Sequence, residues 1–131
     1  MAKKLVFCID FDNTIVVDDF PNIGVDNLYA LDVIRELISN NHKIILYTIR
    51  SNENLLAAEN YLKDNGIELY GVNKNKTQFR FSNSRKVYAD YYIDDKNIGT
   101  PLKDVIYKNG MEKVVDWKKI RNILIDMEIL K

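Results

Sequence analysis

The sequence predicts an α/β fold in which a mostly parallel central sheet has helices on both faces and a β-hairpin and helix follow at the C-terminus. Two observations predict this fold class. Short apolar runs alternate along the chain with segments of helical periodicity, a pattern typical of parallel strands joined by crossover helices. The chain also has 131 residues, the size of one ordinary domain. We therefore assign residues 1–131 to a single domain.

The first half of the chain contains two units of a strand followed by a helix. The apolar run 4–9 predicts a strand buried on both faces. A helix is predicted over 25–40, where apolar residues recur at helical spacing and Asp26 is a suitable N-cap. Residues 43–48 and 54–66 repeat the order of strand and helix. Two such units place successive parallel strands in one sheet.

The second half of the chain changes character toward its end. Two further strands are predicted over 67–72 and 88–94. Residues 104–115 contain an Asn-Gly pair at 109–110 between strand-like segments, which is a strong hairpin signal. Apolar residues at helical spacing then predict a last helix that begins near Asp116.

Composition excludes several broad classes of protein. Lys and Arg together number 19, as do Asp and Glu, so the chain has no global basic field for nucleic acid, although a balanced total can hide local patches. The lone Cys8 cannot form an internal disulfide. The apolar runs fall well short of the ~20 residues of a membrane span, and the N-terminal run is too short for a signal peptide. We expect a cytoplasmic protein without a membrane partner.

Two pairs of acidic residues follow two of the predicted strands. Asp10 and Asp12 come after the first strand, and Asp94 and Asp95 after the fourth. If these strands are neighbours, four carboxylates meet at the carboxyl edge of the sheet, where open α/β sheets bind ligands. Mg²⁺ takes oxygen ligands and needs only one or two carboxylates plus a substrate phosphate, so it would offset their repulsion. The alternative is that each Asp only forms a turn or caps a helix.

These segments resemble the motifs of the haloacid dehalogenase (HAD) superfamily of phosphotransferases. "FCIDFDNTI" looks like its first motif, D-x-D-x-T after an apolar strand; "KIILYT" looks like the second, a strand that ends in Thr48; and "DYYIDDKN" looks like the fourth, a strand that ends in paired Asp. The resemblance covers residues 5 to about 99. It implies a Rossmann-like, HAD-like domain of the small capless phosphatase type.

The resemblance also implies roles for the acidic residues. Asp10 would be the nucleophile that attacks phosphorus to give an aspartyl-phosphate. Asp12 would protonate the leaving oxygen and then activate water, while its backbone carbonyl binds Mg²⁺. Asp10 would supply a carboxylate ligand to the metal together with Asp94, Asp95 or both. Backbone N–H groups around Phe11 and Asp12 would add to the binding of phosphoryl oxygens.

Other polar residues are candidates for contacts with the substrate phosphate. Thr48 and a lysine would hold the phosphoryl oxygens in the family's second and third motifs. We assign the lysine to Lys86 by resemblance, with Lys74 and Lys76 as rivals. Arg50, just past Thr48, is placed to contact a second phosphate or an acidic group, and the alternative is an ordinary surface charge.

The gaps between the motifs leave no room for a cap domain, since residues 15–42 hold one loop and one helix and residues 49–85 a helix, a strand and a loop. An open site suits a macromolecular substrate, a lid from a partner, or a homodimer that covers its own site. Residues 73–86 interleave basic and aromatic side chains without an acidic one, which suits stacking on a base and pairing with a phosphate. The alternative is a solvated loop whose phenylalanines pack onto the core. The substrate contacts we expect are Phe11, Asn13, Arg50, Lys74, Arg80 and Phe81.

The sequence thus predicts a Mg²⁺-dependent phosphohydrolase that acts on a phosphomonoester, such as a nucleotide or a sugar phosphate, through an aspartyl-phosphate. Its ligand would be a small phosphorylated molecule. The alternative keeps the fold and the pocket without turnover: a HAD-like protein that sequesters a phosphorylated or cyclic nucleotide signal. Intact aspartates do not decide between the two, because a badly oriented ester survives beside a competent nucleophile.

Overall fold

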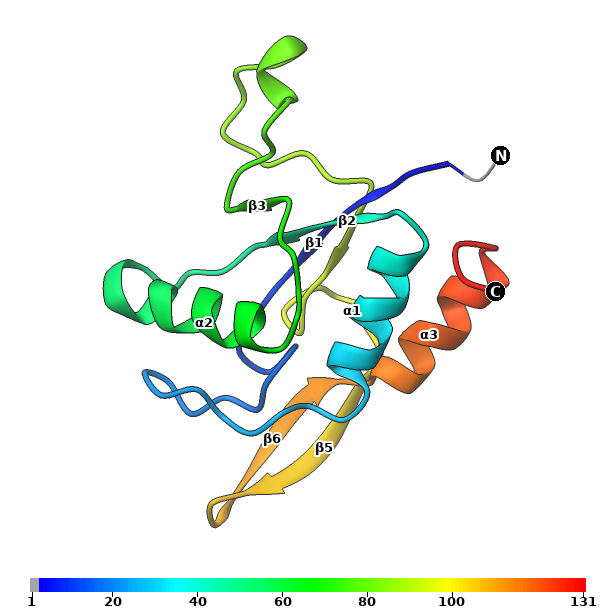
Figure 1. Cartoon of the computed structure of the whole chain (residues 1–131). Coiled ribbons are helices and arrows are strands. Elements are labelled where there is room, and N and C mark those ends of the chain that lie inside the picture. The colour runs from blue at the N-terminus through cyan, green and yellow to red at the C-terminus, as the bar shows by residue number, and fades with distance from the viewer. Residues whose placement is uncertain (1–2) are drawn as a thin grey trace.

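A computed structural model describes residues 3–131. It is an α/β structure with a four-stranded parallel sheet in the order β3-β2-β1-β4 and a separate antiparallel hairpin, β5-β6 (Figure 1). The parallel sheet and the C-terminal hairpin and helix are confirmed. Within the described residues, no helix is both long and apolar enough to cross a bilayer. The elements are β1 (Val6–Ile9), α1 (Ala30–Ser39), β2 (Lys43–Leu46), α2 (Asn52–Asp64), β3 (Gly71–Val72), the 3-10 helix η1 (Gln78–Arg80), β4 (Tyr91–Ile93), β5 (Leu102–Tyr107), β6 (Gly110–Val115) and α3 (Trp117–Asp126).

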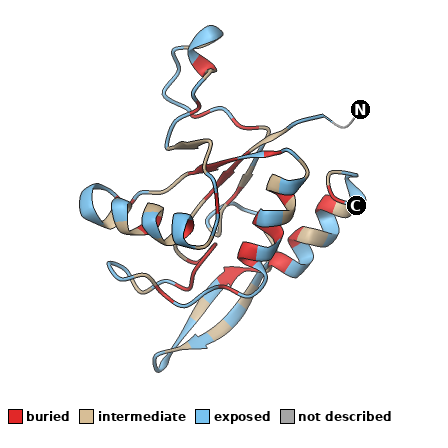
Figure 2. Cartoon of the chain, in the orientation of Figure 1, coloured by how far each residue is buried: buried red, intermediate tan, exposed pale blue. Residues whose placement is uncertain are grey.

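The three α-helices pack against one face of the sheet. Alternate residues of the strands, such as Phe7 and Ile9 of β1, join a single buried cluster with apolar residues of α1, α2 and α3 (Figure 2). The chain steps from β1 to β2 and on to β3 in the same direction across the sheet. Right-handed crossovers in one direction place α1 and α2 on the same face.

The prediction of helices on both faces is therefore wrong. The opposite face carries Cys8 and Ile45, and the segment around Val87 and Ala89 covers it together with partly buried tyrosines. The connection from β3 to β4 runs in the reverse direction across the sheet, so it is the one that a doubly wound fold would use for a second helical layer. Among residues 3–131 this connection holds only the short η1, which leaves the second face thinly covered.

Cys8 tests how well that thin cover excludes solvent. Its side chain is 1% exposed, and burial raises the pKa of the thiol to about 12. Since the thiolate is the reactive form, we expect the folded protein to resist iodoacetamide at mildly alkaline pH and to be modified fully in concentrated guanidinium chloride. Mass spectrometry after timed alkylation measures both states. Rapid modification of the folded protein would contradict the burial of this face.

The predicted boundaries of the first helix need correction. The helix begins at Ala30 rather than at residue 25, and the residue before it is Tyr29 in a left-handed conformation, with no side-chain cap. Asp26 is not the N-cap. It forms an isolated bridge with Val16, and its carboxylate accepts a hydrogen bond from the Tyr61 hydroxyl of α2. Pairing with the first loop therefore competes successfully with helix formation at residues 25–29.

Two strands are shorter than predicted. The segment 67–72 contributes only Gly71–Val72 to the sheet, and the segment 88–94 contributes only Tyr91–Ile93. Both strands lie at the edges of the sheet, where only one neighbour supplies backbone partners. At Gly71 an added Cβ would lie 2.1 Å from a backbone oxygen, so the chain turns tightly there into the segment 73–86.

The hairpin turn is shifted by one residue from the predicted Asn-Gly pair. Lys108 and Asn109 occupy its two central positions with positive φ angles of 47° and 57°, and Gly110 pairs with Tyr107 as the first residue of β6. Positive φ at both central positions is the type I′ pattern, which matches the twist of paired strands. Asparagine tolerates this conformation at the second position.

The hairpin braces the loop that follows β1. The Glu112 carboxylate accepts a hydrogen bond of 2.9 Å from the Asn13 side chain, and the Val115 N–H donates to the Asn13 carbonyl at 3.0 Å. Lys108 pairs with Asp19 at 2.9 Å. These contacts fix the loop that leads away from the acidic end of β1.

Candidate active site and metal centre

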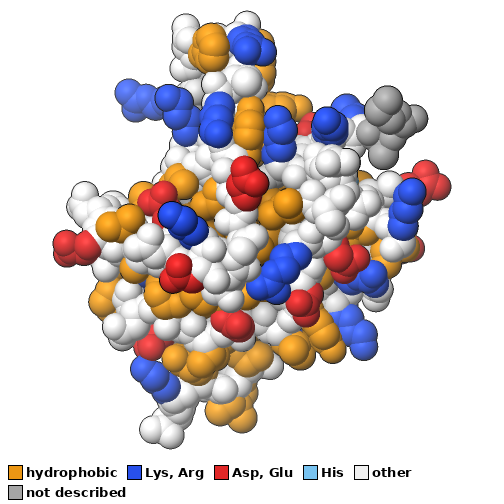
Figure 3. All heavy atoms as spheres, in the orientation of Figure 1, with side chains coloured by type: hydrophobic (Ala, Val, Ile, Leu, Met, Phe, Trp, Pro, Cys, Tyr) orange, Lys and Arg blue, Asp and Glu red, His pale blue; other side chains and the backbone are white. Residues whose placement is uncertain are grey.

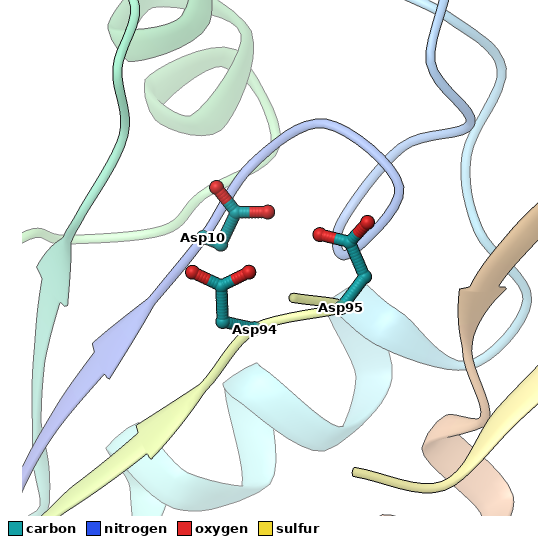
Figure 4. A group of neighbouring side chains, drawn as sticks. All are labelled: Asp10, Asp94 and Asp95. Carbon is teal, nitrogen blue, oxygen red and sulfur yellow. The ribbon is translucent and has the colours of Figure 1, made fainter. Parts of the chain in front are cut away.

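Three carboxylates meet at the carboxyl edge of the parallel sheet. Asp10 follows β1, and Asp94 and Asp95 follow the neighbouring strand β4, in a register that pairs Ile9 with Ile93. Oxygen atoms of the three carboxylates all lie within 4.8 Å of one another, and the side chains point toward a common centre (Figure 4). The expected convergence of these two strand ends is therefore present, although the Asp12 carboxylate is not part of the cluster.

Two of the three carboxylates, those of Asp10 and Asp94, have raised pKa values. Burial and the nearby Asp94 carboxylate raise the pKa of Asp10 to about 8, and burial together with Asp95 raises the pKa of Asp94. An ionised group that is removed from water and placed beside like charges needs a proton or a cation. Three oxygen ligands around one point match the preference of Mg²⁺ or another hard cation, so these residues fit a metal centre.

Thr14 holds the cluster together. Its buried hydroxyl lies 2.9 Å from Asp10 Oδ2 and accepts a hydrogen bond of 3.2 Å from the Asp95 N–H. One threonine thus links the two strand ends that carry the carboxylates. The backbone carbonyl of Thr14 accepts from the Trp117 indole N–H at 2.7 Å, which fixes the threonine from the side of α3. Sequence reasoning gave Thr14 no role beyond its place in the D-x-D-x-T motif.

Asp12 forms a two-point ion pair with Arg50. Arg50 Nε lies 2.8 Å from Asp12 Oδ2, and Arg50 Nη2 lies 2.8 Å from Asp12 Oδ1. The arginine side chain is fully buried, whereas a fifth of the Asp12 side chain remains exposed and lines the cavity described below. The pair therefore fixes the orientation of Asp12 and leaves it accessible from one side.

Arg50 contacts an acidic group, the Asp12 carboxylate, and is buried rather than an ordinary surface charge, but it does not serve the predicted contact with a second phosphate. Its remaining N–H groups donate to the backbone carbonyls of Pro21, Asn22 and Asn54, so all five donors have protein acceptors. Its guanidinium also lies 5.1 Å from the ring centroid of Phe20. No donor is left for a substrate phosphate. Arg50 is a positioning residue that ties Asp12 to the loop around residues 19–22.

A cavity of about 540 Å³ opens beside the three carboxylates. The lysine in its wall is Lys96, whose Nζ lies 3.2 Å from Asp95 Oδ2. The predicted Lys86 is exposed and lies over the Tyr92 ring, outside this wall. Sequence reasoning missed Lys96, although its place directly after the paired aspartates was a usable signal. The cavity is lined by Asp10, Asp12, Asn13, Asp18, Tyr47, Thr48, Ile49, Asn73, Asp94, Asp95 and Lys96.

Thr48 reaches the cavity as predicted. It follows β2, and the side-chain amide of Asn73 fixes its backbone by accepting from the Thr48 N–H at 2.8 Å and donating to the Thr48 carbonyl at 2.9 Å. The Thr48 hydroxyl oxygen accepts from the Arg50 N–H at 3.1 Å, so its own proton is free to be donated. Sequence reasoning did not single out Asn73.

The turn after Asp10 supplies further groups. Phe11 is buried and packs against Tyr61, so its side chain faces the core rather than a substrate. Asn13 lines the cavity, but its side-chain amide is bound to Glu112 and to the Asp18 N–H. Within the described part of the chain, the N–H groups of Phe11 and Asp12 donate to no protein acceptor, whereas the Asn13 N–H faces the Val16 carbonyl in the bridge between Asp12 and Val16.

The other predicted substrate contacts lie outside the cavity. Lys74 lines a separate hollow of about 470 Å³, and Arg80 and Phe81 are exposed on the segment 73–86. Lys76, the second rival for the phosphate-binding lysine, also lines this separate hollow. The cavity and the basic segment are therefore two distinct surfaces, which meet at Asn73.

Comparison with known proteins gives one informative similarity. No family model matches the chain. No curated protein matches it either. A solved structure of a conserved protein from Bacteroides thetaiotaomicron superposes with a TM-score of 0.77 and 28% sequence identity, over 95% of this chain and 93% of that chain. Nearly the whole chain therefore adopts an arrangement also found in that protein.

Proposed function

We propose that this protein is a Mg²⁺-dependent phosphohydrolase of the HAD type that hydrolyses a phosphomonoester through a covalent intermediate on Asp10. The observation that carries the proposal is the set of three carboxylates within 4.8 Å at the carboxyl ends of two neighbouring parallel strands. The raised pKa values of Asp10 and Asp94 mean that their negative charge needs compensation, which a bound divalent cation would supply. Asp10, Asp94 and Asp95 would hold it, and it would supply positive charge to phosphoryl oxygens.

Asp10 would act as the nucleophile. Its Oδ2 accepts from Thr14, which leaves Oδ1 to attack phosphorus. The bond from phosphorus to the leaving oxygen breaks, and Asp12 supplies the proton that this oxygen takes up. Water then attacks the aspartyl-phosphate, Asp12 accepts the proton of that water, and phosphate leaves with Asp10 regenerated. The two-point contact with Arg50 holds Asp12 in the ionised form, which is the form that accepts the proton of water in the second step. The first step requires Asp12 to take up a proton and to open this contact at one oxygen.

Three kinds of donor would hold the phosphoryl oxygens. The hydroxyl of Thr48 has a proton to donate, and the N–H groups of Phe11 and Asp12 lack protein acceptors among the described residues. Lys96, which pairs with Asp95 in this structure, would add positive charge beside the phosphoryl oxygens when Asp95 binds the cation. Preorganised donors of this kind stabilise charge in the transition state.

The direct test is to incubate the protein and Mg²⁺ with a mixed panel of phosphomonoesters and linear and cyclic nucleotides, then to denature it and identify the small molecules by mass spectrometry. Loss of one ester with appearance of its alcohol and phosphate supports the proposal. Recovery of one nucleotide intact but retained by the protein would instead favour the sequestering protein.

We expect Mg²⁺ to stabilise the protein against heat. A ligand that binds only the folded state at about 100 times its Kd contributes about 2.7 kcal/mol, so Tm should rise by several degrees. The Asp94→Asn variant should lose this shift, whereas Asp126→Asn at the exposed end of α3 should keep it. Differential scanning fluorimetry with and without Mg²⁺ measures all three proteins. If Mg²⁺ raises the Tm of Asp94→Asn as much as that of the wild type, the ion does not bind at the three carboxylates.

A further inference from the structure

The segment 73–86, which we call the basic lobe, projects from the body of the protein (Figure 1). Two buried amide side chains brace it. Gln78 donates to the carbonyls of Ser84 and Lys86 and accepts from the Tyr88 N–H, and Asn75 donates to the Tyr88 carbonyl at 3.0 Å. These side chains join the two arms of the lobe in place of a strand ladder. The lobe is therefore a built structure whose outer side chains are held in place.

The basic lobe concentrates positive charge. It contains five of the nineteen Lys and Arg residues and none of the nineteen Asp and Glu residues, so the remainder of the chain has a net charge of −5. All five cations are exposed, and none forms an ion pair within the part of the chain that the structure describes. Figure 3 shows basic side chains gathered over the lobe and its base. The five are Lys74, Lys76, Arg80, Arg85 and Lys86.

Two phenylalanines lie among these cations at the tip of the lobe. Phe79 is 71% exposed and Phe81 is 64% exposed, so neither packs onto the core of the protein. Phe81 contacts Tyr88 edge to face at 5.5 Å between ring centroids, which holds its ring in place. The Arg80 guanidinium lies 5.8 Å from the Phe79 ring centroid. The tip thus offers a free aromatic face directly beside a cation.

The same pairing of lysine and ring continues onto the thinly covered face of the sheet. Lys43 and Lys76 lie over the Tyr70 ring at 4.5 and 5.3 Å from its centroid, and Lys86 lies 5.7 Å from that of Tyr92. At the other end of the lobe, Asn73 lines both the lobe's hollow and the acidic cavity. The basic surface therefore extends from the sheet face, over the lobe, to the rim of the candidate active site.

We propose that the basic lobe binds single-stranded nucleic acid. Cations interleaved with exposed rings match a strand that alternates phosphates and stackable bases, because each base stacks on an aromatic side chain while lysine and arginine track the backbone. An acidic peptide would use the charges but not the rings, and an anionic membrane would favour a broader apolar face. The absence of carboxylates from the lobe means that no negative charge there repels the phosphates of a bound strand.

The lobe also indicates a substrate class for the acidic cavity. Because Asn73 joins the two surfaces, a strand on the lobe leads toward the cavity, and a phosphate at its end is the phosphomonoester that would enter. This second step rests on the proposed function, whereas binding by the lobe does not. An open cavity without a cap is compatible with a substrate that extends far beyond it.

Binding is tested in EDTA, so that hydrolysis plays no part. Fluorescence anisotropy with a labelled oligothymidylate of about twelve nucleotides should show binding whose strength falls with added salt. Replacing both Phe79→Ala and Arg80→Ala should raise Kd at least about tenfold and lower the salt slope by about one. The matched control, Lys118→Ala with Met127→Ala, removes one exposed cation and one exposed apolar group away from the lobe and should bind like the wild type.

Three results would overturn binding by the lobe: no binding of the strand at low salt, equal weakening in the control variant, or binding to phosphatidylserine vesicles in place of the strand. The substrate class is then tested with Mg²⁺ and a strand that carries a terminal phosphate. Phosphate release from that strand with a KM raised in the lobe variant supports it. If phosphate is released from a small aryl phosphate but not from the strand, the proposed substrate class is wrong and the proposed function stands. If phosphate is released from neither, the proposed function is wrong.

Discussion

Replacing Asp10 with asparagine should reduce phosphate release by on the order of ten-thousand-fold or more while leaving the fold intact, because the amide cannot form the acyl-phosphate bond. Asparagine is nearly isosteric and retains an oxygen that accepts from Thr14, whose hydroxyl lies 2.9 Å from Asp10 Oδ2. Steady-state release of phosphate from the ester found in the panel measures the effect. Acid-quenched wild-type protein should in addition carry a phosphoryl group on Asp10, detected by peptide mass spectrometry.

A matched control separates loss of the nucleophile from loss of charge. Asp104→Asn removes a carboxylate that pairs with Lys113 on the hairpin, outside the cavity, and should leave turnover unchanged. Undiminished turnover in Asp10→Asn would remove Asp10 as the nucleophile. Loss of turnover together with unchanged affinity for the ester is the expected pattern, since the variant keeps the remaining phosphate donors.

The same substitution has a predictable effect on stability. In the folded protein without metal, the pKa of Asp10 is raised to about 8 from an ordinary value of 3.8. A raised pKa means that ionisation opposes folding, so the contribution of Asp10 to the stability of the metal-free wild type falls as pH rises from about 4 through about 8. Asp10→Asn removes this titration and should be at least as stable as the wild type at neutral pH when no metal is present. Urea denaturation in EDTA at several pH values measures the difference.

The sequence was a good guide to the strand ends and a poor guide to what surrounds them. Apolar runs identify buried parallel strands because both faces must be apolar, and the residue after each run falls at the carboxyl edge. That rule alone brings Asp10 to Asp94 and Asp95 and places Thr48 nearby. It needs no knowledge of loops, which is why the core of the site was predictable.

Contacts made by long side chains were not predictable in the same way. Lys86 and Lys96 both lie near the paired aspartates in sequence, but only the path of the chain after β4 brings Lys96 to the cavity. Sequence spacing also gave no sign that the connection from β3 to β4 lacks a helix, because the basic and aromatic residues 73–86 are compatible with several conformations. The missing second helical layer follows from that one connection.

Arg50 is the residue whose role changed most between sequence and structure, and it carries the largest expected effect on stability. Removing one partner of a buried ion pair typically costs about 3–5 kcal/mol, because the other charge is left without compensation. Arg50→Met keeps most of the side-chain volume but removes all five donors, which leaves Asp12 and the Pro21 and Asn22 carbonyls unpaired. We expect Tm to fall by roughly 10 to 20 °C.

Two further variants identify the cause of that loss. Arg50→Lys keeps the charge but cannot make the two-point contact with Asp12, so it should recover only part of the stability. Asp12→Asn combined with Arg50→Met removes the uncompensated carboxylate and should be less destabilised than the sum of the two single variants. Strict additivity in this double-mutant cycle, measured by urea denaturation, would mean that Arg50 stabilises the fold through the loop carbonyls rather than through Asp12. Coupling would mean that one buried guanidinium both anchors the loop and sets the position of the proposed general acid, so that stability and catalysis depend on the same contact.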